Sequence, residues 1–543
     1  MSRRRPCPAV LVFQTVRCGV LPGCGERHVC KVSFGTGEIR LSSLVSKDRL
    51  DKPVVKLDGG QRESDGVVVP VIAVSNAAGG KGPDFGHAGN RGKREGMTGT
   101  ARSNYPEGRR AAPAKVRQLQ NRLWAAAKQS PGRRFHALYD RIHRSDVLWA
   151  AWERVRDNRG AAGVDQVTLA AVEDYGVARL LDELAQDLRA GNYRPAPVRR
   201  VEIPKPDGRK RPLGIPTVRD RVAQAAAKLV LEPIFEADFL PCSFGFRPKR
   251  SATDAMEAIR VAFPRGQQLV FEADIGDFFG SIDHDRLMAM VAQRVSDRRV
   301  LKLIGQWLGA GVLVEGVRVE TVTGTPQGGV ISPLLANIFL HHFDRAWAES
   351  GTGELVRYCD DFVVLCSTRD QAEQAQRRAT VILGEFGLEL HPDKTRVVDL
   401  REGCEGFDFL GCHFHARMSG RLWEQRRIVR YYLQRWPSVR SMVRARARVK
   451  ALTGRSSVGR ELEDVIGDLN LFLRGWGNYF RTGNAGDKFT QMDRHVAWRL
   501  RRLLIKKRGR NLRAGQAERW TRTWFHDQGL RKLSGTIRYP KAA

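Results

Sequence analysis

The chain has 543 residues, and 92 Lys and Arg against 59 Asp and Glu give it a formal net charge of +33. A charge of this size and sign points to a polyanion, with nucleic acid as the obvious partner. The longest apolar stretch of the leader, residues 67–74, is far shorter than the ~20 residues of a membrane helix, so no membrane partner is expected. The length allows three or four domains.

Residues 1–110 are predicted to be a poorly structured leader. Residues 1–96 are rich in Gly and Ser and show no sustained helical or strand period. Two explanations stay open, namely that this segment is disordered or that translation starts at Met97. The gaps between its four cysteines lack the close C-x₂₋₄-C pairs of structural zinc modules, which favours incidental thiols over a zinc site. These cysteines are Cys7, Cys18, Cys24 and Cys30.

Residues 111–240 are predicted to form a helical region followed by a pair of strands. Amphipathic helical patterns cover residues 116–128 and 135–155, and a third helical stretch opens at residues 163–165 and continues through 180–188. The Pro-Asp-Gly sequence of residues 206–208 is typical of a turn between two strands. Lys205 and Arg211 flank this turn and would place cations at the tip of a hairpin.

Residues 241–415 are predicted to form a domain whose strands carry acidic side chains at their ends. The apolar run at residues 269–273 leads into Asp274 and then into a turn that contains Gly276. Further on, apolar residues flank the sequence Tyr358-Cys359-Asp360-Asp361 on both sides. This pattern predicts a β-hairpin that presents two adjacent carboxylates at its tip.

Two adjacent carboxylates cost free energy or take up a proton unless a strongly positive group lies between them, and a divalent metal ion is the usual solution. Asp-Asp is also a common surface dipeptide and Asp is a good turn residue, so Asp360 and Asp361 alone would favour an ordinary turn. Asp274 adds a third carboxylate from a separate segment. Two metal ions about 3.5–4 Å apart require such a set, which predicts phosphoryl-transfer chemistry.

The C-terminal part of the chain concentrates the positive charge. Residues 421–543 hold 30 Lys and Arg against 9 Asp and Glu, a net charge of +21. Aromatic residues interrupt the basic runs, so some of them are expected to stack on bases while others lie in the core. A helical pattern ends where Gly475 and Gly477 are expected to form its C-cap, and residues 499–508 form a basic amphipathic pattern. Six tryptophans lie here: Trp423, Trp436, Trp476, Trp498, Trp520 and Trp524.

Seven motifs in order make the chain resemble a group II intron reverse transcriptase and maturase, from about Arg199 to about Tyr539. The motifs are residues 203–216, 243–248, 273–275, 325–334, 358–361, 387–395 and 406–411. The resemblance implies an α+β right-hand polymerase. Residues 111–240 would form an N-terminal extension and fingers, residues 241–415 would form a palm built on an antiparallel sheet, and a helical thumb would follow. The resemblance also implies a thumb or maturase domain at residues 416–485, marked by residues 469–480, and a basic DNA-binding tail at residues 486–543.

The same resemblance implies a role for the three carboxylates and their neighbours. Asp274, Asp360 and Asp361 are expected to be catalytic and to hold two Mg²⁺ ions, with the carbonyl of Ile275 as a further metal ligand. Phe279 is expected to block a ribose 2′-hydroxyl and so to select deoxynucleotides, although a core Phe at the start of a helix is the alternative. Cys359 stands where the family usually has Ala, which leaves the reactivity of its thiol open.

Further residues are expected to bind the nucleotide. By resemblance, Lys205 and Arg211 grip the incoming triphosphate, and Gln327 and Gly328 contact the nucleotide and the template. Lys394 is expected either to protonate the pyrophosphate or to contact the phosphate backbone.

The expected function is RNA-directed DNA synthesis on intron RNA, combined with maturase binding of that RNA during splicing. Deoxynucleoside triphosphates, a DNA primer and target, and a cytoplasmic, nucleoid-associated location follow from the resemblance. No cysteine follows Cys412, so the resemblance is to bacterial members without the C-terminal HNH nuclease, and it implies priming from nicked or replicating DNA. Two alternatives stay open: mainly a splicing maturase, or a captured reverse transcriptase in host defence.

Overall fold

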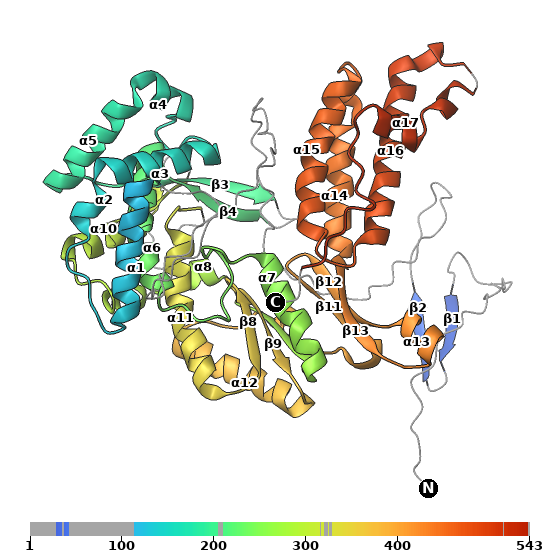
Figure 1. Ribbon diagram of the computed structural model, residues 1–543, viewed down its shortest axis with the longest axis horizontal. Coiled ribbons are helices and arrows are strands. Elements are labelled where there is room, and N and C mark those ends of the chain that lie inside the picture. Colours follow the sequence, from blue (N-terminus) through green and yellow to red (C-terminus); the bar gives the residue numbers. More distant parts are fainter. Residues whose placement is uncertain are drawn as a thin grey trace, which may run out of the picture. The chain divides into compact units, whose positions relative to one another are not determined.

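The computed structural model describes residues 113–204, 210–314, 317–319, 324, 328–513 and 515–540, together with the backbone of two short strands near the start of the chain (Figure 1). The chain divides into two compact units, Met1–Gln61 and Arg62–Ala543. None of the helices within these described ranges combines the length and the apolarity that a bilayer span requires.

The first unit contains an antiparallel hairpin of β1 (Val29–Phe34) and β2 (Gly37–Ser42). Sequence analysis expects no regular structure here, because the alternation of apolar and polar residues in each strand is too short to stand out. The remainder of the leader lies outside the described residues, including Met97 and the zinc candidates Cys7, Cys18 and Cys24. The two explanations of the leader therefore stay predictions.

The second unit begins with a helical layer. The predicted first helix is confirmed as α1, but the two longer predicted stretches are each broken in two. Extended backbone at Arg144, whose guanidinium binds the carboxylate of Asp146, separates α2 from α3. Gly176, with φ of +104°, separates α4 from α5. The bounds are α1 (Ala114–Gln129), α2 (Tyr139–Ile142), α3 (Ser145–Asn158), α4 (Leu169–Tyr175) and α5 (Val177–Ala190).

A four-stranded sheet follows, in the order β4-β3-β6-β7. β3 and β4 pair antiparallel, which confirms the hairpin predicted around residues 206–208, while β3 and β6 pair in parallel. The long helix α6 lies next in the chain, and its buried residues cover nearly all of its circumference, so it is an internal support. The bounds are β3 (Val198–Pro204), β4 (Lys210–Ile215), β6 (Val312–Val314), β7 (Val317–Val319) and α6 (Val218–Glu236).

The palm sheet has the order β10-β5-β9-β8, and all its pairs are antiparallel, as predicted. β5 and β9 are buried along their whole length. The strands are β5 (Leu269–Asp274), β8 (Glu354–Tyr358), β9 (Asp361–Cys366) and β10 (Arg396–Asp399). The helices around them are α7 (Ala252–Ala262), α8 (Phe278–Ser281), α9 (His284–Ala292), α10 (Arg298–Leu308), α11 (Ser332–Ser350) and α12 (Arg369–Glu385).

Alternate residues of the palm strands enter two different hydrophobic cores. Phe271 and Phe362 belong to the core that includes α11 and α12. Val270 and Val363 belong to a second core, which α7 shares with the C-terminal helices. The palm sheet thus separates the two cores, and this fixes which face each side chain takes.

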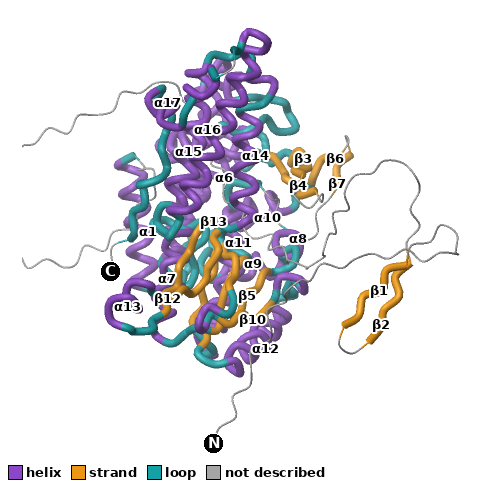
Figure 2. The backbone as a smooth tube through the Cα atoms, turned by 90° about the vertical axis from the view of Figure 1, so that its right-hand side faces the viewer, coloured by secondary structure: helices purple, strands orange, loops and turns teal. Residues whose placement is uncertain are grey.

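A three-stranded sheet, β11-β12-β13, follows the palm sheet, and β11 lies against β10. Figure 2 shows the orange strands β12 and β13 below the helices α15 and α16. The inner face of this three-stranded sheet and the helices α14, α15 and α16 share the second core. The strands are β11 (Gly406–Phe409), β12 (Cys412–Met418) and β13 (Tyr431–Pro437). The helices are α13 (Gly420–Arg426), α14 (Val439–Leu452), α15 (Leu462–Phe480), α16 (Gly486–Arg508) and α17 (Arg522–Asp527).

Candidate active site

The sequence Tyr358-Cys359-Asp360-Asp361 forms the tight turn between β8 and β9, which confirms the predicted hairpin. Cys359 takes the left-handed conformation, with φ of +61°, and so allows the chain to reverse within two residues. Asp361 is the Cα partner of Asp274 across the β5–β9 pair. The turn and the end of β5 therefore bring Asp274, Asp360 and Asp361 to one edge of the palm sheet.

The carboxylates of Asp274 and Asp361 are nearly removed from solvent, with 6% and 5% of each residue exposed. Burial raises the pKa of Asp361 well above its usual range, and the negative charges of Asp274 and Asp360 raise it further. Such crowding of acidic oxygens favours a hard cation. In the part of the chain that the structure describes, however, no group of three acidic, His or Cys side chains is arranged to hold a metal ion.

Lys394 contributes the positive charge next to this cluster. Its ammonium group donates a hydrogen bond of 3.0 Å to Oδ2 of Asp274, and only 7% of Lys394 is exposed. It lies in a short 3₁₀ turn, Pro392–Lys394, directly before β10. The ammonium thus neutralises part of the negative charge at the position where a cation would bind. The expected metal cluster and the nucleotide contact of Lys394 stay predictions.

A second acidic side chain shares the face of β5 that carries Asp274. Glu272 is 6% exposed, and its Oε2 accepts a hydrogen bond of 2.9 Å from Nε of Arg396 on β10. Burial raises the pKa of Glu272 to about 7, and the positive charge of Arg396 opposes this rise. Glu272 belongs to no motif, because it is a single acidic residue within an apolar strand.

The turn is supported by Arg357, which sequence analysis misses altogether. Its guanidinium is completely buried and donates hydrogen bonds to the carboxylate of Asp344, to Oγ of Ser243 at 2.9 Å and to the carbonyl of Cys359 at 3.0 Å. The backbone of Arg357 also bridges to Ser243. One side chain therefore joins α11, the segment before α7 and the turn between β8 and β9. An arginine between Val356 and Tyr358 in an apolar strand is the only sequence signal.

Gly245 explains why the motif at residues 243–248 packs against the turn. A Cβ atom at this position would lie 2.6 Å from the backbone nitrogen of Cys359. Only glycine permits so close an approach of the two backbones. Asn337 on α11 holds the same segment by donating a hydrogen bond of 2.8 Å to the carbonyl of Gly245. The thiol of Cys359 is enclosed here, and burial raises its pKa well above the usual value, which disfavours the reactive thiolate.

Ile275 and Phe279 follow Asp274 directly. Ile275 bridges to Leu390, and the flanking carbonyl of Asp274 accepts a hydrogen bond of 2.8 Å from the backbone of His391. Phe279 is half-buried in α8, with its ring 5.3 Å from that of Phe278. Its expected contact with a ribose, and the expected ligation by the Ile275 carbonyl, stay predictions.

The expected nucleotide-binding residues are only partly within the described residues. Lys205 and Gln327 lie outside them, and Arg211 is described by its backbone in β4 alone. Gly328 is exposed and has φ of +116°, and a Cβ atom there would lie 2.5 Å from the carbonyl of Gly214 in β4. The loop that carries Gly328 therefore lies against the strand that carries Arg211.

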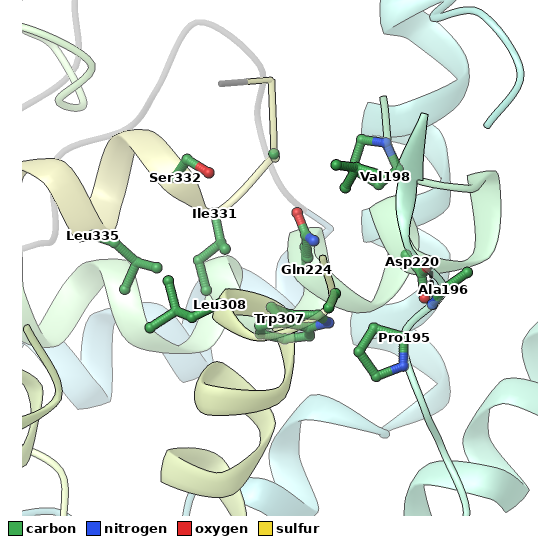
Figure 3. A pocket seen from close by; sticks show the side chains of 13 residues that line it. Pro195, Ala196, Val198, Asp220, Gln224, Trp307, Leu308, Ile331, Ser332 and Leu335 are labelled. Atoms are coloured by element: carbon green, nitrogen blue, oxygen red, sulfur yellow. Dashed lines mark hydrogen bonds between the residues drawn. The ribbon is translucent and has the colours of Figure 1, made fainter. Parts of the chain in front are cut away.

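A small cavity beneath this loop is shown in Figure 3. Gln224 of α6 points into it, and its Oε1 accepts a hydrogen bond of 2.8 Å from the backbone of Val330. Trp307 and Leu335 line the same cavity. This arrangement makes the cavity a support for the loop that follows Gly328.

The helices α14 and α15 bind the turn between β11 and β12 through hydrogen bonds. Tyr479 of α15 donates a hydrogen bond of 2.8 Å to the carbonyl of Leu410, and Ser441 of α14 donates one of 2.7 Å to the carbonyl of Gly411.

The predicted C-cap at Gly475 and Gly477 is wrong, because α15 runs through both residues to Phe480. A Cβ atom at Gly477 would lie 2.6 Å from Cδ2 of Leu533, so this glycine allows close packing instead.

The predicted basic amphipathic helix over residues 499–508 is confirmed as the end of α16. Its apolar side chains belong to the same core as α14 and α15, across the expected boundary at residue 485. Trp498 is 48% exposed on this helix, and the guanidinium of Arg502 lies 4.8 Å from its ring centre. Trp520, in contrast, is buried, as expected for some of the six tryptophans.

Two family models match this chain. The family described as reverse transcriptase (RNA-dependent DNA polymerase) matches residues 203–414, which include the palm sheet and the carboxylates. The family described as group II intron, maturase-specific domain matches residues 442–524, which include α15 and α16. The matched ranges cover most of the structure described after α5.

Individual proteins are similar over parts of the chain. Protein YkfC of Escherichia coli is 33% identical over 57% of this chain and 91% of its own length. The group II intron-encoded protein LtrA of Lactococcus lactis is 38% identical over 39% of this chain and 35% of LtrA, so the alignment spans about a third of that relative. A chain of a solved partial Cas6-RT-Cas1--Cas2 complex is 24% identical over 46% of this chain and 42% of its own, with a TM-score of 0.30.

Proposed function

Because this chain belongs to the family of group II intron reverse transcriptases and maturases, we propose that it copies intron RNA into DNA at the carboxylates of the palm sheet. The observation that carries the proposal is the register of β5 and β9. It sets Asp274 opposite Asp361, while Asp360 occupies the adjacent turn. A buried acidic edge of this kind is suited to a reaction on phosphate groups, provided that cations offset its charge.

In the proposed reaction, the 3′-hydroxyl of a DNA primer attacks the α-phosphate of a deoxynucleoside triphosphate, and pyrophosphate leaves. Phe279 excludes a ribose 2′-hydroxyl, and Lys205, Arg211, Gln327 and Gly328 bind the nucleotide and the template strand. When the nucleotide binds, the ammonium group of Lys394 leaves the carboxylate of Asp274 and contacts a phosphate group. Arg357 holds the turn through the Cys359 carbonyl, so that Asp360 and Asp361 keep their positions during the reaction.

We propose two Mg²⁺ ions as the cations, held by Asp274, Asp360 and Asp361 and by the carbonyl of Ile275. All of these donors are oxygen atoms, which hard divalent cations prefer. When bound, such ions stabilise negative charge on the reacting phosphate. The raised pKa of Asp361 fits this donor set, because burial raises it first and the like charges of Asp274 and Asp360 raise it further. Before ions bind, Lys394 supplies part of that compensation.

A second function, binding of the intron RNA as a maturase, is favoured by the match of residues 442–524 to the maturase-specific domain. The proposed surface consists of the basic faces of α14 and α16, and residues 486–543 are proposed to bind the DNA target. With RNA and DNA as substrates, we propose that the protein acts in the cytoplasm and at the nucleoid.

Primer extension on an RNA template with Mg²⁺ tests the polymerase proposal. The wild type is compared with Asp360→Ala and Asp361→Ala, and with Glu354→Gln as a control for an acidic residue elsewhere in the same hairpin. We expect extension by the wild type and the control, and none by the two Asp variants. Equal extension by all four proteins would refute the site. Splicing of the cognate intron by the Asp variants is expected to persist, since the RNA-binding surface is separate.

A further inference from the structure

The hairpin of β12 and β13 has a face that the proposed polymerase reaction does not use. The register pairs His413 with Trp436, His415 with Gln434, and Arg417 with Tyr432. Because side chains alternate along a strand, these residues share one face, opposite to the face that enters the second core. We call the set His413, His415, Arg417, Tyr432 and Trp436 the β12–β13 platform.

The rings of the platform lie next to each other. The ring centre of Trp436 lies 5.3 Å from that of His413 and 6.3 Å from that of His415. The guanidinium of Arg417 lies 4.4 Å from the ring centre of Trp436. The three rings are half-buried, whereas Arg417 and Tyr432 are exposed. The platform thus presents a row of flat groups to solvent along two adjacent strands.

The layer beneath the platform is closely packed. Phe407 and Phe414 lie on the inner face of the same sheet, with their ring centres 5.0 Å apart and their planes nearly parallel. Both are completely buried in the second core. On the outer face, Nδ1 of His413 and Oδ1 of Asp408 are 2.7 Å apart, which fixes the orientation of this ring. The rings are therefore held in place before any partner binds.

The charge around the platform is strongly positive. Residues 412–437 contain six Arg and one acidic residue, Glu424. Arg435 is buried and pairs with Glu257. Asp408 lies beside His413, so five Arg remain against two acidic residues. Among the arginines, Arg430 lies over the ring of Tyr432 at 5.4 Å. Flat rings between arginines match the faces of unpaired bases and the phosphates that join them. A protein partner would need acidic residues of its own to neutralise these arginines. A polynucleotide, in contrast, brings one phosphate with each base.

We propose that the β12–β13 platform binds unpaired RNA by stacking bases on Trp436, His413 and His415, with Arg417 and Arg430 contacting phosphates. The choice of RNA rests on the proposed function. In RNA-templated synthesis, the DNA product is paired with its template, while the RNA ahead of the copied stretch has unpaired bases.

The sheet that carries the platform lies beside the palm sheet, because β11 contacts β10. Asp408 of β11 lies 2.7 Å from His413 of the platform, and the neighbouring strand β10 carries Arg396. Glu272 in turn binds Arg396 and lies two residues before Asp274 in β5. An RNA segment on the platform would therefore lie beside the palm sheet. The end of the platform nearest to the palm sheet is the one formed by His413 and Trp436.

Binding of single-stranded RNA to the full chain tests the platform. The probe is a fluorescent RNA of about 12 nucleotides, within the range of site sizes known for stacking surfaces. Trp436→Ala is expected to weaken binding by about 5- to 150-fold, since stacking of one base contributes that much. Trp436→Phe retains a flat ring and is expected to bind nearly as the wild type does. Trp149→Ala, at another exposed tryptophan, is the matched control and is expected to change nothing.

Arg417→Gln provides a variant that does not disturb packing, because this side chain is exposed. It is expected to reduce RNA affinity and to lower the salt dependence of binding. Extension by a single nucleotide on a template without further unpaired bases is expected to be unchanged in both variants, which shows that the palm is intact. Unchanged RNA affinity in Trp436→Ala and Arg417→Gln would overturn the proposal.

Cross-linking locates the RNA directly. A template with 4-thiouridine in its unpaired segment is expected to cross-link to residues of β12 or β13 in the wild type. Cross-links from the DNA primer to these strands, with none from the RNA, would overturn the assignment of RNA. A wild type that binds RNA through the platform but extends no primer would refute the polymerase proposal and leave the platform standing. The two proposals therefore fail separately.

Discussion

Arg357 and Asp344 form a bidentate ion pair in which neither side chain is exposed to solvent. Nε of Arg357 lies 2.6 Å from Oδ1 of Asp344, and Nη2 lies 2.5 Å from Oδ2. Because the same guanidinium binds the Cys359 carbonyl, this pair connects helix α11 to the turn that carries Asp360 and Asp361.

Removal of one partner of this pair is expected to destabilise the protein strongly. Asp344→Ala leaves a buried guanidinium without its counter-charge, a change that costs about 3–5 kcal/mol in comparable pairs. Glu373→Ala removes an exposed pair with Arg369 and is expected to cost less than about 0.5 kcal/mol. Urea unfolding of both variants measures the difference, and equal midpoints would contradict the importance of the buried pair.

The conservative change Arg357→Lys separates positioning from stability. A single ammonium group cannot contact Asp344, Ser243 and Cys359 in the manner of a guanidinium. We expect this variant to unfold at a lower temperature than the wild type. Its kcat should fall, while its KM for the nucleotide should change less. A change in KM alone would argue against a role in holding the turn.

Asp361→Asn is expected to raise the stability of the metal-free protein while it abolishes DNA synthesis. The neutral amide removes one of several crowded negative charges, whose repulsion contributes to the raised pKa of Asp361. Each kcal/mol of relieved repulsion raises Tm by at most about 2 °C in a unit of this size, because the entropy of unfolding grows with chain length. Thermal unfolding in a chelator measures this, and added Mg²⁺ is expected to stabilise the wild type but not the variant. A lower Tm for the variant in the chelator would contradict the electrostatic account.

Phe279→Ala is expected to admit ribonucleotides. If the ring excludes a 2′-hydroxyl, its loss should reduce discrimination by about 10- to 200-fold, the range in which pockets separate ligands that differ by one small group. Phe279→Tyr retains the bulk and serves as the control. Competition between a ribonucleotide and the matching deoxynucleotide in primer extension gives the ratio. Unchanged discrimination in Phe279→Ala would leave Phe279 as a core residue packed against Phe278.

Acidification is expected to destabilise the protein through His341 on α11. Burial lowers the pKa of His341 to about 4, while Asp344 opposes this shift and His342 and Arg345 reinforce it. The unfolded chain therefore takes up the proton first, and stability falls as the pH drops from about 6.5 towards 4. Between pH 7 and 5 the wild type is expected to lose about 1–2 kcal/mol more than His341→Gln. Unfolding at both pH values measures this, and parallel losses would contradict it.

The parts of the site that sequence analysis predicts are local in the chain. Asp274 ends an apolar strand, and Asp360 and Asp361 lie in a turn between two apolar runs, so period and turn chemistry suffice to place them. The family, identified from ordered motifs, is confirmed by both matched models.

The parts that sequence analysis misses depend on distant segments. Ser243 and Arg357 are 114 residues apart, and no local pattern pairs them. The sequence pattern predicts a helix end at Gly477, but this glycine instead makes room for the side chain of Leu533. The helical periods in the N-terminal extension are correct, but they do not reveal the breaks at Arg144 and Gly176, because a break changes the direction of a helix and not the spacing of its apolar residues.

The strand order β10-β5-β9-β8 has a consequence for the synthesis of this protein on the ribosome. β5 is the first palm strand to be made, yet its neighbours are β9 and β10, and Lys394 follows Asp274 by 120 residues. At about 5–20 residues per second, both edges of β5 stay without their partners for about 5 to 25 s. During that interval the nascent chain exposes an apolar strand with open edges. Chaperones that bind such strands are therefore expected to set the yield of active protein.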